Sequence, residues 1–311
     1  MNETGHAHHD STTYLAPAAA LEKLAIMNSH NNAPTQFVEA NGIRFAYRRF
    51  GNDSGVPLLF MQHFRGGMDH WDPAITDGFA KDRPVVLFDN AGVAGSTGDT
   101  PDTIDAMAEH AADFVHALGL LQMDIFGFSL GGYIAQSFTL RHSELVRRLI
   151  LVGTAPRGGV PRQDPKATEH SMSTDPSTGE IGLEAFLYLF FSRSARGQAA
   201  GRAFWERRHQ RKKDVDLPTT EQTMKAQSAA ILEWRQVRGE RFAELKDITR
   251  PALVVNGNND VMVPTINAFT LSQYMPDAQL IIYPDAGHAS QYQYPELFLL
   301  HASAFLDRLF D

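Results

Sequence analysis

Most of this chain alternates between short apolar runs and segments long enough to form helices. The runs are VPLLFMQ, PVVLFDN, MDIFGF, RRLILVG, PALVVNG and AQLIIYP. Runs this short and this continuously apolar are typical of parallel strands buried on both faces. The segments at about 101–119, 130–141, 264–275 and 295–310 carry apolar residues at helical spacing, as crossover helices do. The alternation therefore predicts an α/β core with a mostly parallel, doubly wound sheet.

The chain upstream of this alternation has a different pattern. The segment TQFVEANGIRFAYRRFG contains two extended runs joined by Asn41-Gly42, a dipeptide that tolerates the positive φ angles of a tight hairpin turn. We therefore expect an antiparallel hairpin at the start of the fold. Residues 1–34 form a leader that we expect to be flexible, and within it only residues 16–27 have helical periodicity.

The alternation stops between about Thr154 and Arg250, where no strand pattern occurs. Three amphipathic stretches, GLEAFLYLFFS, QAAGRAFWERRHQ and TEQTMKAQSAAILEWR, predict helices there instead. An insertion between two strands of such a sheet lies over the carboxyl ends of the strands, where ligands bind. We therefore expect one core formed by residues 35–154 and 251–311, with residues 155–250 as a helical cap.

Composition narrows the classes of partner. A net charge of −8 disfavours binding to nucleic acid or to anionic lipid, because both require excess Lys and Arg. The absence of cysteine excludes disulfides, thiolate metal sites and cysteine nucleophiles. The N-terminal residues lack the pattern of a secretory signal, and no apolar run is long enough to cross a membrane. We expect a cytoplasmic protein that binds a small molecule, and a homo-oligomer remains open.

One motif in the chain is typical of a nucleophilic serine. Gly127-Phe128-Ser129-Leu130-Gly131 is a G-x-S-x-G sequence placed between the predicted strand MDIFGF and a predicted helix. Glycines are needed on both sides because the strand-to-helix turn leaves no room for side chains. The serine is thereby exposed at the start of a helix. This setting favours a nucleophile over a serine that merely caps a helix.

A serine nucleophile needs a base, and the base needs a partner that fixes its tautomer. The C-terminal third of the chain contains candidates for both. Asp260 follows the strand PALVVNG, and His288 follows the next strand, AQLIIYP. The order serine, acid, histidine, each after its own strand, is that of the hydrolase triad.

These three regions together resemble the α/β-hydrolase superfamily, in the group of small esterases, lactonases, cofactor-free haloperoxidases and carbon–carbon bond hydrolases. The resemblance covers about residues 36–311 and rests on GFSLGG, GNNDVMVP and PDAGH. It implies the α/β-hydrolase fold with Ser129 as nucleophile, Asp260 as the orienting acid and His288 as general base.

The resemblance also implies an oxyanion hole made of two backbone N–H groups. Leu130 would supply one, because it follows the nucleophile. The other comes from a loop usually written His-Gly followed by the donor residue; here Gln62 and His63 occupy the His-Gly positions, and Phe64 is the expected donor. A histidine in place of the glycine adds bulk near the site. The residues that we assign to the substrate pocket are His63, Arg65 and Phe128.

Several residues allow a second interpretation. Asp285 is a rival acid, although a carboxylate three residues before His288 more often caps a local turn. His63 either contacts substrate or packs against neighbouring loops. The basic run at residues 207–213 either attracts an anionic substrate or, more commonly for such runs, ends a helix in solvent.

The predicted function is hydrolysis of carboxylic esters or lactones of small, hydrophobic substrates through an acyl-enzyme on Ser129. This chemistry requires no metal and no organic cofactor. A cofactor-free haloperoxidase (perhydrolase) and a carbon–carbon bond hydrolase are alternatives, since both use the same triad. A ligand-binding receptor of this fold is an alternative from another class, because His63 in the oxyanion loop is unusual for an enzyme.

Overall fold

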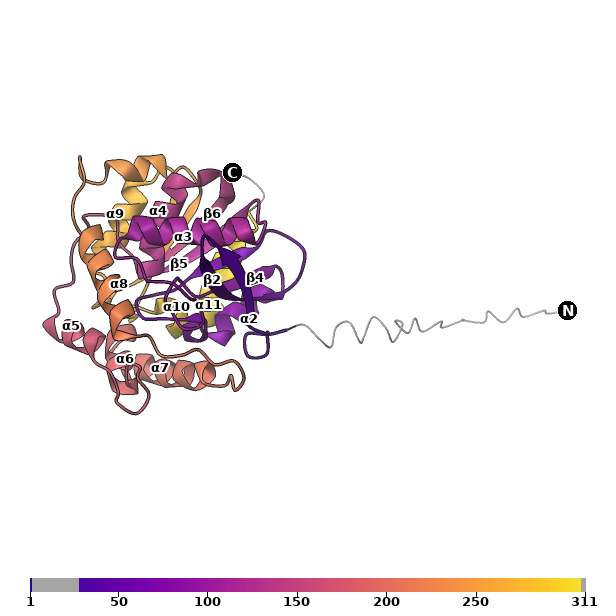
Figure 1. Cartoon of the computed structure of the whole chain (residues 1–311), viewed down its shortest axis with the longest axis horizontal. Helices are drawn as coiled ribbons and strands as arrows, with labels where there is room; N and C mark the ends of the chain where they lie inside the picture. The colour runs from indigo at the N-terminus through magenta and orange to yellow at the C-terminus, as the bar shows by residue number, and fades with distance from the viewer. Residues whose placement is uncertain (2–27, 309–311) are drawn as a thin grey trace.

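An eight-stranded sheet forms the centre of the computed structural model, which describes Met1 and residues 28–308 (Figure 1). The strand order is β1-β2-β4-β3-β5-β6-β7-β8. β2 is antiparallel to β1 and to β4, and all other neighbouring strands are parallel. The strands are β1 (Gln36–Ala40), β2 (Ile43–Gly51), β3 (Leu58–Met61), β4 (Pro84–Phe88), β5 (Met123–Phe128), β6 (Val146–Val152), β7 (Ala252–Gly257) and β8 (Ala278–Tyr283).

This topology confirms the predicted architecture. Each of the six apolar runs forms one strand of the parallel part, from β3 to β8. The predicted hairpin is formed by β1 and β2, and its turn residues Asn41 and Gly42 have φ angles of 48° and 76°. Side chains that alternate along β3 enter two separate hydrophobic clusters, so both faces of the sheet are buried.

Helices cover both faces of the sheet. On one face, α3 (Ile104–Ala117), α4 (Leu130–Arg141) and α9 (Ile266–Tyr274) share a hydrophobic cluster with Leu59 and Met61. On the other, α2 (Pro73–Ala80), the single-turn α10 (Ser290–Gln293) and α11 (Pro295–Leu306) share the cluster of Leu58 and Phe60. The predicted crossover helices at 101–119, 130–141, 264–275 and 295–310 correspond to α3, α4, α9 and α11. Both layers of the doubly wound core are therefore present.

Four α-helices lie between β6 and β7, and we call them the helical insertion. They are α5 (Pro165–Met172), α6 (Leu183–Phe190), α7 (Ala195–Arg208) and α8 (Glu221–Trp234). The three predicted amphipathic stretches form α6, α7 and α8, whereas α5 was not expected. Figure 1 shows the four helices together along one side of the sheet, at the left and bottom of the view. α6 and α7 extend the apolar cluster of α11, while α8 packs near α3.

The last residues of the predicted leader are part of the fold. His30 and Ala33 are fully buried. The His30 N–H donates to Asp77 Oδ1 at 2.7 Å, and His30 Nδ1 lies 2.9 Å from the Thr76 hydroxyl, which anchors this segment on α2. Residues 2–27, including the predicted helix at 16–27, lie outside the described residues. The folded core thus begins before residue 35.

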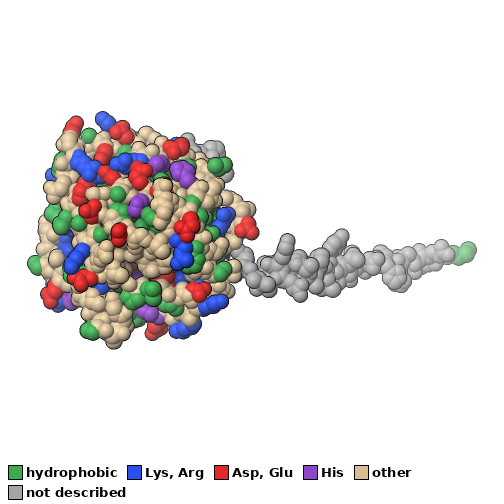
Figure 2. Space-filling view, viewed as in Figure 1, with side chains coloured by type: hydrophobic (Ala, Val, Ile, Leu, Met, Phe, Trp, Pro, Cys, Tyr) green, Lys and Arg blue, Asp and Glu red, His purple; other side chains and the backbone are tan. Residues whose placement is uncertain are grey.

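The visible surface mixes charges of both signs. In Figure 2, acidic and basic side chains alternate over the face in view without a large patch of one sign. No helix in the described part of the chain combines the length and the apolar character needed to cross a membrane.

Candidate active site

Ser129 occupies a sharp turn between β5 and α4. Its φ and ψ angles are 55° and −115°, a region that side-chain-bearing residues seldom adopt. The turn is held by two hydrogen bonds: Ser129 N–H donates to Val152 O at 2.9 Å, and the Thr154 hydroxyl donates to Ser129 O at 2.9 Å. A Cβ on Gly131 would lie 1.9 Å from the Met61 carbonyl oxygen, so this position of the motif requires glycine.

The Ser129 side chain is free to face the neighbouring pocket. It makes no capping hydrogen bond to α4, although it stands at the N-terminus of that helix. The residue is 9% exposed and lines a pocket. The alternative of a simple helix cap therefore does not describe this serine.

Asp260 and His288 form a buried pair. His288 Nδ1 lies 2.8 Å from Asp260 Oδ2, and both side chains are almost fully buried. The other carboxylate oxygen of Asp260 accepts hydrogen bonds from the N–H groups of Met262 and Val263, both at 2.8 Å. These contacts hold the carboxylate in one orientation, and the carboxylate in turn favours the tautomer of His288 that carries its proton on Nδ1.

The histidine lies beside the serine turn. The ring of His288 packs on that of Phe128, with centroids 5.1 Å apart, and a Cβ on Gly153 would lie 3.1 Å from His288 Nδ1. Phe128 precedes Ser129, and Gly153 follows Val152, whose carbonyl oxygen accepts the hydrogen bond from the Ser129 N–H. Loops after β5, β7 and β8 thus bring the three predicted residues to the carboxyl edge of the sheet. Ser129 Oγ forms no hydrogen bond with His288 in the described chain.

The backbone N–H groups of Phe64 and Leu130 have no partner among the described residues. Phe64 lines the same pocket as Ser129. The preceding residues are fixed by Gln62, whose Oε1 accepts from His63 N–H at 2.8 Å and whose Nε2 donates to Gly67 O at 3.3 Å. This bracing role of Gln62 was not visible in the sequence, because it depends on the loop folding back on itself.

The pocket over Ser129 has a volume of about 270 Å³, close to the lower end of small-molecule sites. Its walls come from both parts of the fold. The helical insertion contributes residues of α5 and α8, and the core contributes residues from the loop after β3, from α4 and from the loop after β7. The lining residues are Phe64, Ser129, Tyr133, Arg162, Thr168, Ser171, Met172, Ser228, Ile231, Leu232, Arg235, Met262 and Val263.

The three residues assigned to the pocket from the sequence do not line it. Phe128 is fully buried in the core. His63 and Arg65 line a neighbouring cavity of only about 20 Å³. The His63 ring packs against Phe128 and Phe190, with centroid distances of 5.4 and 5.0 Å. Burial lowers the pKa of His63 to about 3, so this side chain is a neutral packing residue.

Arg65 joins the loop after β3 to the helical insertion. Its guanidinium donates to the carbonyl oxygens of Ser171 and Ser173, the latter at 2.8 Å, and to the Thr174 hydroxyl at 3.0 Å. Its N–H donates to Gln227 Oε1 at 2.8 Å. The side chain therefore points away from the pocket and ties the Phe64 loop to the segment after α5.

The three arginines of the basic run at residues 207–213 turn inward, whereas Lys212 and Lys213 are exposed, so the expected solvated helix end is present only in part. Arg207 pairs with Asp72 at 2.6 Å, and Arg208 pairs with Glu180 at 2.7 Å. Arg211 donates to two carbonyl oxygens of the N-terminal segment. Sequence could not reveal these partners, because each of them lies far away along the chain.

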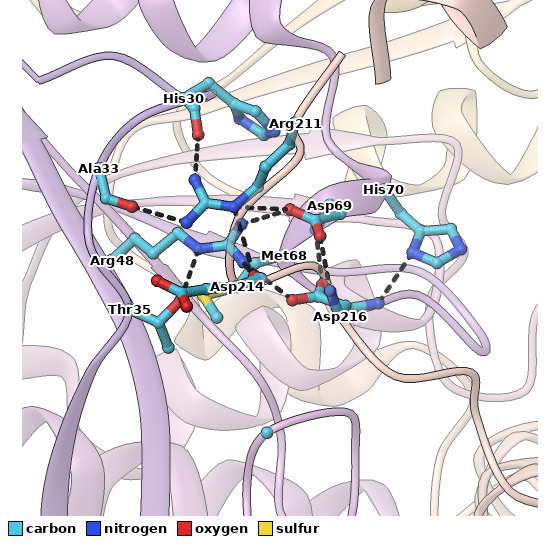
Figure 3. A network of polar contacts seen from close by, with 12 residues as sticks. His30, Ala33, Thr35, Arg48, Met68, Asp69, His70, Arg211, Asp214 and Asp216 are labelled. Carbon is cyan, nitrogen blue, oxygen red and sulfur yellow. Dashed lines mark hydrogen bonds and ion pairs between the residues drawn. The ribbon is translucent and has the colours of Figure 1, made fainter. Parts of the chain in front are cut away.

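Arg211 belongs to a buried network that joins the insertion to the core (Figure 3). In Figure 3, Arg48 of β2 points toward two carboxylates, those of Asp69 and Asp216. The two aspartates exchange hydrogen bonds with each other's backbone N–H groups, both at 2.7 Å. Burial, with Asp69 close by, raises the pKa of Asp216 to about 7. Asp69 lies in the 3-10 turn directly after the Phe64 loop, so the network fixes the position of that loop.

The rival acid Asp285 is engaged elsewhere. Its Oδ2 accepts a hydrogen bond from the Ser194 hydroxyl at 2.6 Å. Ser194 is the N-cap of α7, so Asp285 connects the loop after β8 to the helical insertion. His288 is hydrogen-bonded to Asp260 and not to Asp285.

Comparison with known proteins places this geometry in one family. The model of the alpha/beta hydrolase fold family matches residues 56–295. A solved structure, an alpha/beta hydrolase fold protein from Chitinophaga pinensis, is 40% identical, covers 90% of this chain and 99% of its own, and superposes with a TM-score of 0.82.

Among curated relatives, the 2-hydroxymuconate semialdehyde hydrolase of Pseudomonas sp. strain CF600 is 26% identical over 90% of this chain and 97% of its own. The pimeloyl-[acyl-carrier protein] methyl ester esterase of Nitrosomonas europaea is 31% identical over 80% of this chain and 94% of its own. Both relatives are hydrolases, and the shared fold, the strand-to-helix serine turn and the family match agree. The chain belongs to the alpha/beta hydrolase fold family.

Proposed function

We propose that this protein is a serine hydrolase that cleaves small carboxylic esters or lactones through an acyl-enzyme on Ser129. The observation that carries the proposal is the strained turn that presents Ser129 to a pocket of about 270 Å³ beside the His288–Asp260 pair. A serine hydroxyl next to a histidine with a fixed tautomer is the arrangement that acyl transfer requires.

The mechanism follows from these positions. Ser129 Oγ attacks the substrate carbonyl carbon while His288 Nε2 takes the hydroxyl proton. The N–H groups of Phe64 and Leu130 stabilise the tetrahedral oxyanion, and His288 then protonates the leaving alcohol. Water repeats these steps on the acyl-enzyme and releases the acid. Asp260 stays ionised and stabilises the imidazolium of His288. The serine–histidine hydrogen bond is often long before substrate binds, which is compatible with its absence here.

The helical insertion acts in this proposal as a cap. Residues of α5 and α8 form one wall of the pocket, so substrate binds between the insertion and the core.

The position of His63 also bears on the receptor alternative. His63 lines the smaller cavity and not the pocket of Ser129, which removes the reason for thinking that it blocks the oxyanion site.

A second candidate function is carbon–carbon bond hydrolysis. Two relatives support it: the semialdehyde hydrolase from strain CF600 and a 2-hydroxy-6-oxo-6-(2'-aminophenyl)hexa-2,4-dienoic acid hydrolase from Metapseudomonas resinovorans, which is 26% identical over 89% of this chain. The methyl ester esterase supports the ester reaction at the higher identity of 31%. The same nucleophile serves both reactions, so the substrate decides between them.

The test is release of nitrophenol from acetate, butyrate and hexanoate esters. We expect turnover by the wild type and a loss of at least about 10³-fold in Ser129→Ala. Ser272→Ala on α9, outside the pocket, is the control and should keep wild-type turnover. Equal rates for the wild type and Ser129→Ala would overturn the proposal. Faster turnover of a dienoic acid ketone than of any ester would favour the second candidate.

A further inference from the structure

We propose that the substrate carries a free carboxylate, which Arg162 and Arg235 bind at one end of the pocket. This inference rests on the proposed hydrolase function and names its substrate class. Both arginines line the pocket that contains Ser129. Neither was singled out by the sequence, because they are far apart along the chain and belong to no motif.

The two arginines mark one end of the pocket. Beyond the main volume lies a second cavity of about 10 Å³, and its walls again include Arg162, Arg235 and Tyr133. Met262 and Val263, whose N–H groups donate to Asp260 Oδ1, are also common to both cavities. The guanidinium groups therefore sit where the main pocket narrows, on the side of the Asp260 loop.

The two guanidinium groups are incompletely neutralised by the protein, because the charge of Asp164 acts on Arg162 only from beyond ion-pair distance. Among the described residues, Arg162 and Arg235 form no ion pair; Arg162 has only weak contacts, such as those to the Ser171 hydroxyl and the Met262 sulfur, both at 3.3 Å. The acid nearest to Arg235 in sequence, Glu233, pairs with Arg157 at 2.8 Å and also with Arg238.

The acid nearest to Arg162 in sequence is also occupied. Asp164 caps α5 and accepts a hydrogen bond from the Tyr188 hydroxyl at 2.8 Å. Arginine at a protein surface is well hydrated, but two half-buried guanidinium groups in one pocket repel each other and lose water. The positive charge at this end is thus compensated only in part, by Asp164 from a distance, until an anion binds.

Electrostatics agree with the geometry. Burial and the nearby charge of Arg235 lower the pKa of Arg162. Burial raises the pKa of Tyr133 to about 12, so its hydroxyl remains protonated. That hydroxyl makes no hydrogen bond to another described residue and lies among the same pocket walls. Two cations and one neutral donor therefore line the same end of the pocket, and no carboxylate of the described residues forms an ion pair with either cation.

A carboxylate fits this set of donors better than other groups do. Guanidinium binds the two oxygens of a carboxylate through parallel hydrogen bonds, and a nearby hydroxyl adds a third donor. The rest of the lining is largely apolar, with Met172, Ile231 and Leu232 on the insertion side. The ligand is therefore an acid whose aliphatic chain separates the free carboxylate from the bond that Ser129 attacks, such as a half-ester of a straight-chain dicarboxylic acid.

The test compares nitrophenyl half-esters of the dicarboxylic acids from succinic to suberic acid with neutral esters in which an isopropyl group replaces the carboxylate. We expect the wild type to have a higher kcat/KM for the charged ester of the best-fitting length. In Arg162→Gln and Arg235→Gln, this preference should fall by about 10- to 100-fold, because charge-assisted hydrogen bonds are lost. The rates with the neutral esters are the reference within each variant, because a general change of pocket shape lowers both rates and leaves their ratio unchanged.

Arg202→Gln is the matched control, because it removes the same charge from an exposed pair with Glu184 on the insertion. The preference should stay at the wild-type value in this variant. An equal kcat/KM for charged and neutral esters in the wild type would overturn the inference while leaving the hydrolase proposal intact. So would an equal loss of preference in all three variants, since that would indicate a general charge effect.

A binding measurement separates this inference from the hydrolase proposal. Titration calorimetry with free adipate, on the wild type and on the arginine variants, requires no turnover. Binding that weakens about 10-fold or more in Arg162→Gln and Arg235→Gln supports the carboxylate site even if no ester is cleaved. No detectable adipate binding to the wild type, together with no charge preference in turnover, would contradict it.

Discussion

Two groups of arginines that meet the helical insertion differ in how their charge is compensated. Arg48 and Arg211 are almost fully buried and face the carboxylate of Asp69, with Asp216 as a second partner of Arg48 (Figure 3). Arg162 and Arg235 are half-buried in the pocket and form no ion pair among the described residues.

The difference separates charges that hold the fold from charges that are available to a ligand. A buried ion pair adds little net stability, but removing one partner leaves the other charge uncompensated and costs several kcal/mol. The network of Arg48, Asp69 and Asp216 therefore fixes the insertion and the Phe64 loop relative to each other. A guanidinium without an ion-pair partner does not fix the fold in this way, and its removal should change ligand binding more than folding.

The largest expected effect is on folding. Arg48→Met should lower the free energy of unfolding by about 3–5 kcal/mol, because Asp216 loses its ion-pair partner and buried Asp69 keeps only the more distant Arg211, at 3.8 Å. Arg235→Met should lower it by less than about 1 kcal/mol. Urea denaturation followed by circular dichroism measures both values. Equal losses in the two variants would remove the distinction between the two groups of arginines.

A smaller effect is expected on the pH dependence of stability. Burial lowers the pKa of His63 from its ordinary 6.5 to about 3, so the unfolded chain takes up a proton that the folded chain does not. Stability from this residue is present above pH 6.5 and is lost as the pH falls toward 3. Between pH 7 and 5 the loss is about 2 kcal/mol. In urea titrations, the free energy of unfolding of His63→Gln should therefore fall by about 2 kcal/mol less than that of the wild type between pH 7 and 5. An identical loss would show that His63 is protonated in the folded state.

Asp216 should act in the opposite direction. Its pKa is raised to about 7 in the fold, so the folded chain holds a proton that the unfolded chain releases above its ordinary pKa of 3.8. The stability linked to this proton is lost as the pH rises through 7. Asp216→Asn cannot take up this stabilising proton. Acidification from pH 7 to 5 should therefore lower the free energy of unfolding of the variant by about 2 kcal/mol more than that of the wild type. The same urea titrations measure this, and parallel curves would be evidence against a proton on Asp216.

The smallest effect is expected at the surface. Arg202 and Glu184 form an ion pair in which both side chains are exposed. Arg202→Gln should change the free energy of unfolding by less than about 0.5 kcal/mol, because water screens such pairs. Thermal unfolding at low and high salt would detect a larger contribution. A loss comparable to that of Arg48→Met would mean that burial is not what distinguishes the pairs.

The sheet and the loops that carry the triad residues could be predicted from the sequence, because they depend on local patterns. Apolar runs predicted six strands, and the glycines around Ser129 predicted its turn. The spacing of Asp260 and His288 after two consecutive strands predicted their meeting, and they lie 2.8 Å apart. Each inference needed only the rule that parallel strands end at one edge of a sheet.

The pocket walls and the ion pairs could not be predicted from the sequence, since they arise from contacts between residues that are distant in sequence. Arg65 and His63, from the loop of Phe64, were assigned to the pocket, yet Arg65 has a positive φ and its side chain reaches the insertion. The basic run at 207–213 resembled a solvated helix end. Its partners, such as Asp72 and Glu180, are set by how the insertion docks on the core.

The most direct test of the central claim is labelling with a fluorophosphonate, followed by mass spectrometry of the intact protein and its peptides. The account predicts one adduct, on the peptide containing Ser129, no adduct in Ser129→Ala, and slower labelling in Asp260→Asn by about 10³-fold or more. Labelling of another residue, or no labelling of a folded wild-type protein, would contradict the assignment of Ser129 as the nucleophile.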